Sequence, residues 1–218
     1  MTTSMQMFGN FKIPEKTPEE WAEWNAMLER EEQEKKAQEA YQRLKDAHIP
    51  REYENATDLL PEVKEWAQNP TVGLLLTGES GRGKTYQASG ALKEITRTNR
   101  ALFTTFDEIK HDCKDCFKDY RRESDVIRDY VFPYCLLIDD MGKEQVTEWS
   151  LPILFEIIKK RGEKLRPTII TTNYSGKELQ KRLTVNGEIV TAKALISRMS
   201  AYKIIKMDGK DRRKSIMI

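Results

Sequence analysis

Five short apolar runs, rich in β-branched residues, recur along the chain from residue 71 onward. The segments between them are long enough for helices, and a further short helix is expected over residues 61–68. Strands that alternate with helices in this way are typical of an α/β fold with a parallel, doubly wound sheet and helices on both of its faces. The predicted strands are Thr71–Thr77, Ala101–Phe106, Tyr134–Asp139, Thr168–Thr172 and Tyr202–Met207.

The N-terminal part of the chain follows a helical period instead. Thr17 and Glu20 have the spacing of a capping box, with Pro18 at the first helical position, and this predicts a helix start. One apolar face follows, and then every residue from 30 to 36 is polar. The apolar face can dock on the main domain or anchor a partner protein. Its residues are Trp21, Trp24 and Leu28.

The length of the chain favours one main core with an appendage, because 218 residues are few for two full domains. We expect residues 1–48 to form an N-terminal tail and a charged amphipathic helix, which is the candidate partner-binding part. Residues 45–60 contain Pro50 and several turn-forming residues and are expected to be a linker. Residues 49–218 are expected to form the main domain.

Composition narrows the class of protein. With 37 Lys and Arg against 35 Asp and Glu, the net charge of +2 neither demands nor excludes a nucleic-acid partner. Cys113, Cys116 and Cys135 are too few for a disulfide framework and fit a reducing compartment. No apolar run approaches the roughly 18 residues of a membrane span, so we expect a cytoplasmic protein that does not engage a membrane.

The stretch GESGRGKT, residues 78–85, follows the first predicted strand and opens a helix. This context and the spacing GxxxxGKT are those of a P-loop, in which backbone N–H groups and a helix N-terminus bind a polyphosphate. Lys84 is expected to reach the β and γ phosphates, and the Thr85 hydroxyl to ligate Mg²⁺. The alternative is a Gly-rich turn without a ligand. The predicted nucleotide-binding residues are Gly78, Glu79, Ser80, Gly81, Arg82, Gly83, Lys84, Thr85 and Tyr86.

Acidic and amide side chains close two further predicted strands. Asp139 and Asp140 end the run YCLLIDD; Asp139 is expected on the Mg²⁺ side, and Asp140 is expected to orient and deprotonate the attacking water. Such a doublet can also be a helix-capping device. Asn173 follows Thr171 and Thr172 in TIITTN, at the strand end where ligands of open α/β sheets bind, and can hold the water and sense the γ phosphate. The alternative for Asn173 is a turn residue.

Four motifs, GESGRGKT, LLIDDMGKE, PTIITTN and ISRMS, resemble in that order the AAA+ ATPases of the DnaC/DnaI helicase-loader and IstB group. The segments HIPREYENATDLL and FTTFDEIK also match, so the resemblance covers about residues 49–213. It implies a three-layer P-loop (AAA+/ASCE-type) fold with a five-stranded parallel sheet, and an AAA+ ATPase domain over residues 49–218. The chain differs from this group in its short charged N-terminal helix and in a lid that is minimal or absent.

The resemblance also implies roles for single residues. Asn173 corresponds to sensor 1, and Arg198 in ISRMS to the arginine finger, which acts on the nucleotide of a neighbouring subunit and therefore requires an oligomer. Arg161 is a weaker second candidate for the finger. Arg213, rather than Arg212, corresponds to the sensor 2 that touches the nucleotide. A surface salt bridge for Arg198 and a solvated basic tail for Arg213 are the alternatives.

The function implied by the resemblance is an ATP-dependent loader that places a replicative DNA helicase on single-stranded DNA, with ATP and Mg²⁺ as cofactors. The helicase is expected to bind through residues 17–30, and the chain to self-associate into an AAA+ oligomer. An IstB-like transposition helper that acts on duplex DNA is the alternative. A third reading is a non-hydrolysing, nucleotide-gated adaptor; it needs no water-activating acid, so the doublet of Asp139 and Asp140 disfavours it.

The stretch HDCKDC, residues 111–116, invites a zinc site but lacks a second pair of ligands. Its thiols are expected to pack in the core, on one stripe of a helix. The opposite side of that helix carries a basic row, which can track the phosphates of single-stranded DNA or pair with nearby acids as a solvated face. The stripe is Ile109, Cys113, Cys116, Phe117 and Tyr120, and the row is Lys110, Lys114, Lys118 and Arg121 or Arg122.

Overall fold

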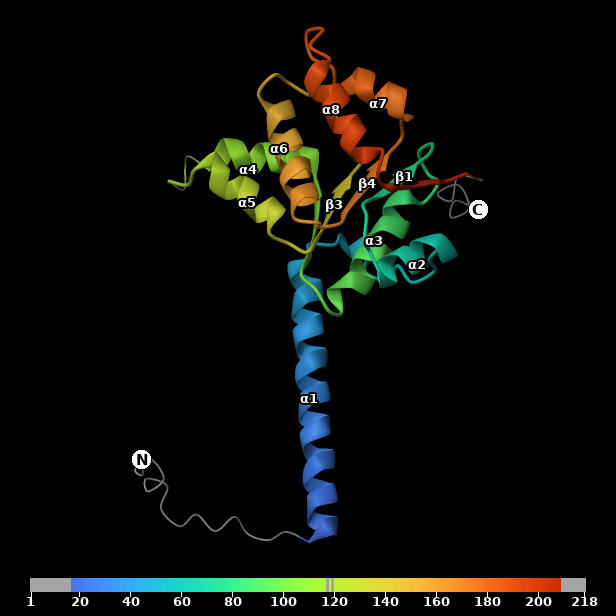
Figure 1. Ribbon diagram of the computed structural model, residues 1–218, viewed down its shortest axis with the longest axis vertical. Coiled ribbons are helices and arrows are strands. Elements are labelled where there is room, and N and C mark those ends of the chain that lie inside the picture. Colours follow the sequence, from blue (N-terminus) through green and yellow to red (C-terminus); the bar gives the residue numbers. More distant parts are fainter. Residues whose placement is uncertain (1–16, 117, 119, 209–218) are drawn as a thin grey trace, which may run out of the picture. The chain divides into compact units, whose positions relative to one another are not determined.

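The computed structural model describes residues 17–116, 118 and 120–208. The chain divides into two compact units, Met1–Glu39 and Ala40–Ile218. The second unit contains the whole sheet of the protein (Figure 1). Within the described part of the chain, no helix combines the length and the apolar character needed to cross a lipid bilayer.

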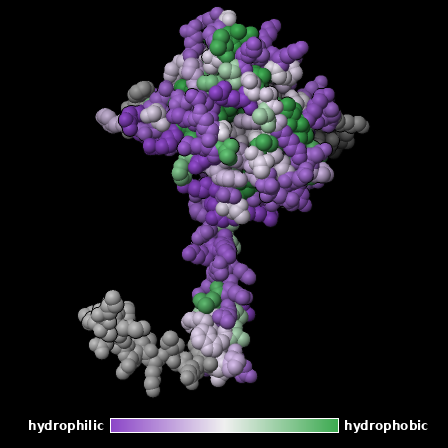
Figure 2. All heavy atoms as spheres, viewed as in Figure 1, coloured by the Kyte–Doolittle hydropathy of each residue, from purple (hydrophilic) through white to green (hydrophobic). Residues whose placement is uncertain are grey.

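Helix α1, Pro18–Asp46, begins at the predicted capping box. The Glu20 N–H donates to Thr17 Oγ1 over 3.2 Å, and the Thr17 N–H donates to Glu20 Oε2 over 2.7 Å. None of the residues of α1 is buried, and Figure 2 shows its surface as largely hydrophilic. Ion pairs such as that between Lys36 and Glu32, 2.6 Å apart, stabilise a solvated helix of this kind.

A parallel five-stranded sheet forms the centre of the second unit, in the order β2-β3-β4-β1-β5. The five predicted strands are confirmed; Thr168–Thr172 is predicted to the residue, and the others are one to three residues shorter than predicted. Since parallel strands end at the same edge, this order brings the carboxyl ends of β3, β4 and β1 side by side. The strands are β1 (Leu74–Thr77), β2 (Ala101–Thr105), β3 (Cys135–Asp139), β4 (Thr168–Thr172) and β5 (Lys203–Lys206).

Alternate strand residues face two different helical layers. Leu74 and Leu76 pack in one core with two helices, whereas Leu75 between them packs in a second core with the remaining ones. The sheet is therefore covered on both faces, and the predicted three-layer α/β fold is confirmed. The first layer is α2 (Pro61–Gln68) and α3 (Lys84–Thr96). The second is α4 (Phe106–Asp115), α5 (Glu123–Val131), α6 (Ser150–Glu163), α7 (Gly176–Leu183) and α8 (Val190–Met199).

The segment over residues 45–60, expected to be a linker, contains the predicted turns but is packed on the domain. Ala47 and Ile49 are buried, and the Ala47 carbonyl accepts a hydrogen bond of 2.8 Å from the Phe103 N–H of β2. A short 3₁₀ helix follows, η1 (Arg51–Tyr53). This segment packs against the sheet, and the compact unit that contains the sheet accordingly begins at residue 40, before the predicted boundary at residue 49.

The prediction of a single helix around HDCKDC is wrong, because α4 ends at Asp115 and the next helix, α5, begins at Glu123. Cys113 and Cys116 are buried as predicted, and burial raises the pKa of the Cys113 thiol to about 12. Tyr120, in contrast, is 99% exposed and does not belong to the core. Phe117 lies outside the described residues. Of the predicted stripe, Ile109, Cys113 and Cys116 therefore lie in the core.

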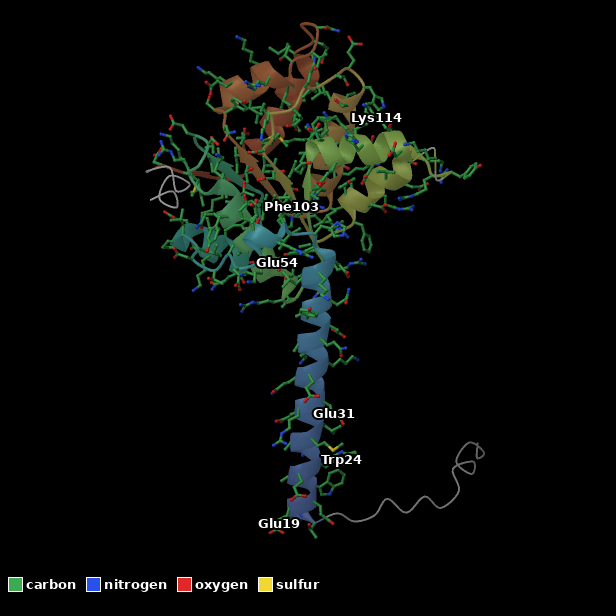
Figure 3. The ribbon with its side chains drawn as sticks, turned by 180° about the vertical axis from the view of Figure 1, so that it is seen from behind. Glu19, Trp24, Glu31, Glu54, Phe103 and Lys114 are labelled. Atoms are coloured by element: carbon green, nitrogen blue, oxygen red, sulfur yellow. The ribbon has the colours of Figure 1, made fainter. Side chains whose placement is uncertain are left out.

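The basic residues predicted to form a row on this helix are engaged with their neighbours. Ion pairs join Lys110 to Asp107, Lys118 to Asp115, Arg121 to Asp129 and Arg122 to Asp125. Lys114, labelled in Figure 3, lies 5.6 Å from the centroid of the Trp149 ring. These contacts favour the solvated, self-paired face over a surface that follows DNA phosphates.

Candidate nucleotide-binding site

The loop between β1 and α3 uses backbone conformations that favour glycine. Gly81 and Gly83 have φ angles of +81° and +84°, and Gly83 is the N-cap of α3. Gly78 has a φ of +146°, and a Cβ there would lie 2.4 Å from the Met207 carbonyl oxygen. The loop therefore curls tightly over the start of α3, where free N–H groups and the positive end of the helix dipole suit a phosphate.

Lys84 is buried under this loop although it carries a charge. Its Nζ donates hydrogen bonds of 2.8 Å to the carbonyl oxygens of Gly78 and Glu79. Glu79 in turn forms an ion pair with Arg82 of the same loop. The ammonium group thus lies inside the loop that is predicted to bind the β and γ phosphates, as a phosphate-binding lysine requires.

A pocket of about 550 Å³ opens beside the loop. It brings together residues predicted from three separate motifs: the P-loop, the acid doublet and the end of β4. Its lining includes Ser80, Lys84, Thr85, Tyr86, Asp140 and Asn173. Residues that are far apart in the sequence, such as Ser80 and Asn173, therefore meet at the carboxyl ends of the strands, where open α/β folds bind their ligands.

Thr85 and Asp139, the two predicted magnesium ligands, are in contact. Thr85 Oγ1 donates to Asp139 Oδ1 over 3.0 Å. Burial raises the pKa of Asp139 and the Asp140 carboxylate raises it further, whereas hydrogen bonds from Thr171 and Thr85 act in the opposite direction. A hydroxyl beside a carboxylate supplies the hard oxygen donors that Mg²⁺ prefers, and a divalent cation would offset the cost of burying Asp139. These residues fit the ion.

Asp140 is held by the neighbouring strand. Its φ of +53° lies in the left-handed region, which is uncommon for a residue other than glycine. Its N–H donates to Thr171 Oγ1 over 2.8 Å, and Thr171 Oγ1 donates to Asp139 Oδ1 over 2.6 Å. The Asp140 carboxylate lies 3.3 Å from Lys143 Nζ and lines the pocket. An acid in this place can reach a water that attacks a bound phosphate.

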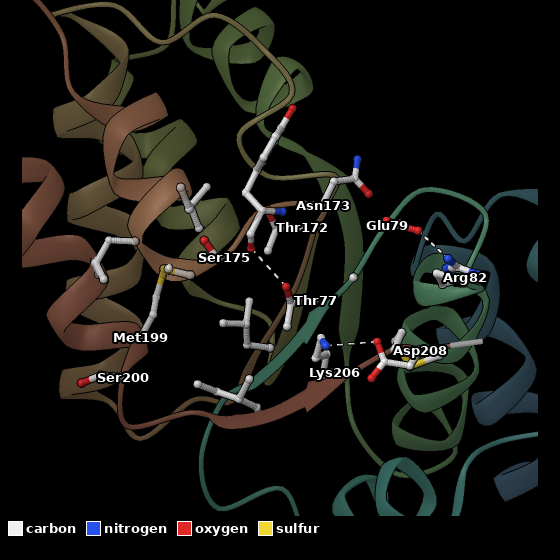
Figure 4. Close-up of a pocket in the computed structure, with 18 residues that line it drawn as sticks. Thr77, Glu79, Arg82, Thr172, Asn173, Ser175, Met199, Ser200, Lys206 and Asp208 are labelled. Carbon is white, nitrogen blue, oxygen red and sulfur yellow. Dashed lines mark hydrogen bonds and ion pairs between the residues drawn. The ribbon is translucent and has the colours of Figure 1, made fainter. Parts of the chain in front are cut away.

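Asn173 follows β4 and faces the P-loop side of the sheet edge (Figure 4). Its Oδ1 is buried, and among the described residues it has no hydrogen-bond partner. A buried amide oxygen without a partner costs free energy unless a ligand or a water satisfies it. Together with Glu79 and Arg82, Asn173 also lines a more apolar pocket of about 630 Å³ that extends toward β5. The amide oxygen without a partner fits a polar ligand beside Asn173.

Tyr53 and Tyr86 add an aromatic wall that was not predicted as such. Both line the 550 Å³ pocket. The Tyr86 hydroxyl accepts hydrogen bonds from the Thr57 N–H over 3.2 Å and the Asp58 N–H over 3.3 Å. Tyr86 therefore ties the segment before α2 to the first turn of the P-loop helix. Tyr86 is one of the predicted nucleotide-binding residues, whereas Tyr53 lies in the segment HIPREYENATDLL, which does not reveal the contact itself.

Most of the sequence, from α2 onward, matches a known family. Residues 62–216 match the family described as IstB-like ATP binding protein, a range that includes the P-loop, the acid doublet and Asn173. The chain belongs to this IstB-like family. Its members are described as ATP-binding, so the family supports ATP as the nucleotide in the pocket.

Two relatives of the IstB-like chain bear on its function. It is 30% identical over 133 residues to an ATP-binding protein of insertion sequence IS5376 from Geobacillus stearothermophilus, over 61% of this chain and 51% of that protein. It is 25% identical over 190 residues to the replicative helicase loader DnaC of Escherichia coli strain K12, over 77% of this chain and 78% of DnaC. The chain thus spans about half the length of the first relative and most of the second.

Solved structures confirm the fold of the IstB-like chain. A crystal structure of DnaI has a TM-score of 0.64 at 21% identity, over 76% of this chain and 95% of DnaI. A crystal structure of the DnaC helicase loader has a TM-score of 0.57 at 25% identity, over 67% of this chain and 86% of that one. The chain therefore shares the AAA+ P-loop fold and its five-stranded parallel sheet with DnaI and with the DnaC helicase loader.

Arg198 of the IstB-like chain does not line the pocket beside the P-loop. It lies in the last turn of α8, with its guanidinium 4.6 Å from the centroid of the Phe155 ring. It lines a different pocket together with Gly73 and Tyr202, which precede β1 and β5. The P-loop follows the carboxyl end of β1, so Arg198 and the P-loop lie at opposite edges of the sheet.

The prediction of Arg161 as a second candidate for the arginine finger is wrong. Its side chain is fully buried and makes six hydrogen bonds within the same chain. The acceptors are the carbonyls of Tyr130, Val131, Pro133, Tyr134 and Pro167 and the Thr168 hydroxyl. A guanidinium enclosed in this way cannot reach the nucleotide of another subunit. Arg212 and Arg213 lie outside the described residues, and sensor 2 stays a prediction.

Proposed function

We propose that this IstB-like protein is a Mg²⁺-dependent ATPase that assembles with copies of itself in the cytoplasm and loads a replicative DNA helicase onto single-stranded DNA. The observation that supports hydrolysis most directly is that the two acids of the doublet lie in different surroundings. Asp139 accepts a hydrogen bond from Thr85, the other proposed Mg²⁺ ligand, whereas Asp140 lines the pocket. A protein that only holds ATP needs no second acid there.

Each residue of the pocket has a role in this proposal. The backbone N–H groups of the P-loop and Lys84 bind the β and γ phosphates. Thr85 and Asp139 would hold a Mg²⁺ ion, which would supply positive charge against the phosphate oxygens. Asp140 accepts a proton from the attacking water, and Asn173 orients that water through its amide group.

The helicase partner is proposed from the DnaC relative, which is a replicative helicase loader. Helix α1 offers a docking surface for it: an apolar patch of Trp21, Trp24, Met27 and Leu28, each 41–45% exposed. Figure 3 shows Trp24 on this helix, among polar side chains such as Glu19 and Glu31. An apolar stripe on an otherwise solvated helix suits a groove on a partner protein.

A transposition helper that acts on duplex DNA is the second candidate function. The insertion-sequence relative and the description of the family favour it. The two functions differ in the nucleic acid they need. A loader should raise the amount of helicase on single-stranded DNA, whereas a transposition helper should bind duplex DNA in the presence of ATP and leave helicase loading unchanged.

The Asp140→Asn variant is expected to bind ATP as tightly as wild type but to hydrolyse it roughly 100-fold more slowly or worse, because the amide cannot accept the proton of the attacking water. ATP affinity and steady-state phosphate release measure the two properties separately. Asp115→Asn, which removes an exposed acid of α4, is the matched control and should hydrolyse ATP at the wild-type rate.

Two results would decide against these roles. An Asp140→Asn protein that releases phosphate at the wild-type rate would remove Asp140 as the base. A wild-type protein that binds ATP but releases no phosphate, alone or with helicase and single-stranded DNA, would favour the nucleotide-gated adaptor.

The double variant Trp21→Ala/Trp24→Ala is expected to weaken helicase binding at least about tenfold, because truncating two aromatic anchors costs on the order of 2 kcal/mol. The melting temperature should stay unchanged if the pair contacts the helicase. Tyr41→Ala is the control, since Tyr41 is an aromatic residue of the same helix that is 59% exposed. Unchanged binding would contradict the anchor, and a lowered melting temperature would favour docking of the tryptophans on the protein itself.

A further inference from the structure

We infer that Thr171 is a positioning residue that holds both acids of the doublet in place for catalysis. The inference rests on the proposed ATPase function and adds a residue of β4 to it. Thr171 is not among the residues that line the 550 Å³ pocket, whereas its hydroxyl is hydrogen-bonded to both Asp139 and Asp140. Its effect on the reaction is therefore exerted through these two acids.

Thr171 accepts hydrogen bonds from the backbone just beyond the point where the regular pairing of β3 and β4 ends. The backbone register between β3 and β4 extends as far as Ile138 and Ile170. Beyond it, Thr171 Oγ1 accepts from the Asp140 N–H over 2.8 Å, and the Thr171 carbonyl accepts from the Met141 N–H over 2.8 Å. The side-chain oxygen thus fills the place of a ladder carbonyl at the point where Asp140 adopts its left-handed backbone.

The single proton of the Thr171 hydroxyl is assigned by its neighbours. The group that faces it from Asp140 is a backbone N–H, which can only donate, so the hydroxyl donates to Asp139 Oδ1, 2.6 Å away. The Thr171 hydroxyl therefore fixes both the carboxylate of Asp139, the proposed Mg²⁺ ligand, and the backbone of Asp140, the proposed base. Thr171 is fully buried, so solvent water has no access to replace these hydrogen bonds.

Asn173 follows Thr171 by two residues along the same chain, and its buried Oδ1 lacks a partner among the described residues. The end of β4 therefore carries, two residues apart, the amide proposed to sense the γ phosphate and the hydroxyl that fixes both acids. A small shift of this strand end on nucleotide binding would be transmitted to Asp139 and Asp140 through the Thr171 hydroxyl.

Thr171→Val is the decisive variant, because it keeps the shape of the side chain and removes the hydroxyl. Thr171→Ala removes the hydroxyl with less bulk, and Thr171→Ser retains it. Thr96→Val is the matched control: Thr96 is a buried threonine whose hydroxyl donates to the Lys93 carbonyl of its own helix, away from the pocket. All variants are compared as full-length chains at equal folded fraction, judged by circular dichroism.

The first readout is the response of nucleotide binding to Mg²⁺, which does not depend on turnover. The gain in affinity for a fluorescent ATP analogue between EDTA and saturating Mg²⁺ should fall about tenfold in Thr171→Val and Thr171→Ala, with the affinity in EDTA unchanged. The second readout is kcat for ATP hydrolysis, which should fall about 10- to 100-fold in the same variants. Thr171→Ser should stay within about threefold of wild type in both, and Thr96→Val should match wild type.

The inference is overturned if Thr171→Val or Thr171→Ala keeps the wild-type Mg²⁺ response, or if Thr171→Ser loses it as fully as Thr171→Val does. The proposed ATPase function fails separately, if the wild-type protein releases no phosphate from ATP. In that case the Mg²⁺ response of nucleotide binding still decides whether Thr171 positions Asp139.

Discussion

Arg198→Ala is expected to lower the rate of ATP hydrolysis roughly 1,000-fold and to leave the affinity of a single chain for ATP unchanged. Arg198 lies at the edge of the sheet opposite to its own P-loop, beside Phe155. From there it can meet a γ phosphate only when a second copy of the protein supplies that phosphate. A guanidinium placed in this way stabilises charge that develops in the transition state, so its loss should appear in kcat.

A mixture of two inactive variants tests the action of Arg198 on a neighbouring copy. Arg198→Ala retains Asp140, and Asp140→Asn retains Arg198, so a mixed assembly contains interfaces with both groups. Phosphate release should appear in the mixture and be absent from either variant alone. Arg166→Ala removes another arginine from the same pocket and should stay within about twofold of wild type. A mixture as inactive as its components would contradict action in trans, and an active Arg198→Ala would favour the surface salt bridge.

The sheet and the P-loop could be predicted because each requires particular residue types at particular positions in the sequence. Strands buried on both faces are rich in apolar and β-branched residues, and β3 and β4 are completely buried. The P-loop needs backbone conformations that glycine alone adopts easily, so Gly78 and Gly83 stand at fixed spacing before Lys84. Both signals are local, and for that reason one sequence suffices to find them.

The contacts of Thr171 and Arg161 could not be predicted in the same way. The sequence shows Thr171 as one polar residue at a strand end, and its two partners become visible only when β3 and β4 lie side by side. An arginine at a helix end is usually exposed, as the prediction for Arg161 assumed. Its acceptors are mostly backbone carbonyls. Because every residue has a carbonyl, the identities of these residues give no sign that they accept hydrogen bonds from Arg161.

Arg161→Met is expected to lower the free energy of unfolding by about 3 kcal/mol or more, because several buried carbonyl oxygens lose their donor at once. The six hydrogen bonds of Arg161 join α6 to the segments that lead into β3 and β4. Burial lowers the pKa of Arg161 to about 10, still far above neutral, so the guanidinium remains charged in the core. Its charge is balanced by the dipoles of the surrounding carbonyls. Urea unfolding followed by circular dichroism measures the loss.

The neighbouring Lys160 supplies the control that separates a structural from a catalytic role. Lys160 lies on the same helix, is partly exposed and pairs with Glu156 at 2.6 Å, so Lys160→Met should cost less than about 1 kcal/mol. If Arg161 acted as an arginine finger, Arg161→Met would unfold at the same urea concentration as Lys160→Met and lose only its ATP hydrolysis. We expect the reverse, since a guanidinium enclosed by the carbonyls of its own chain stabilises the amino ends of β3 and β4 and has no access to another subunit.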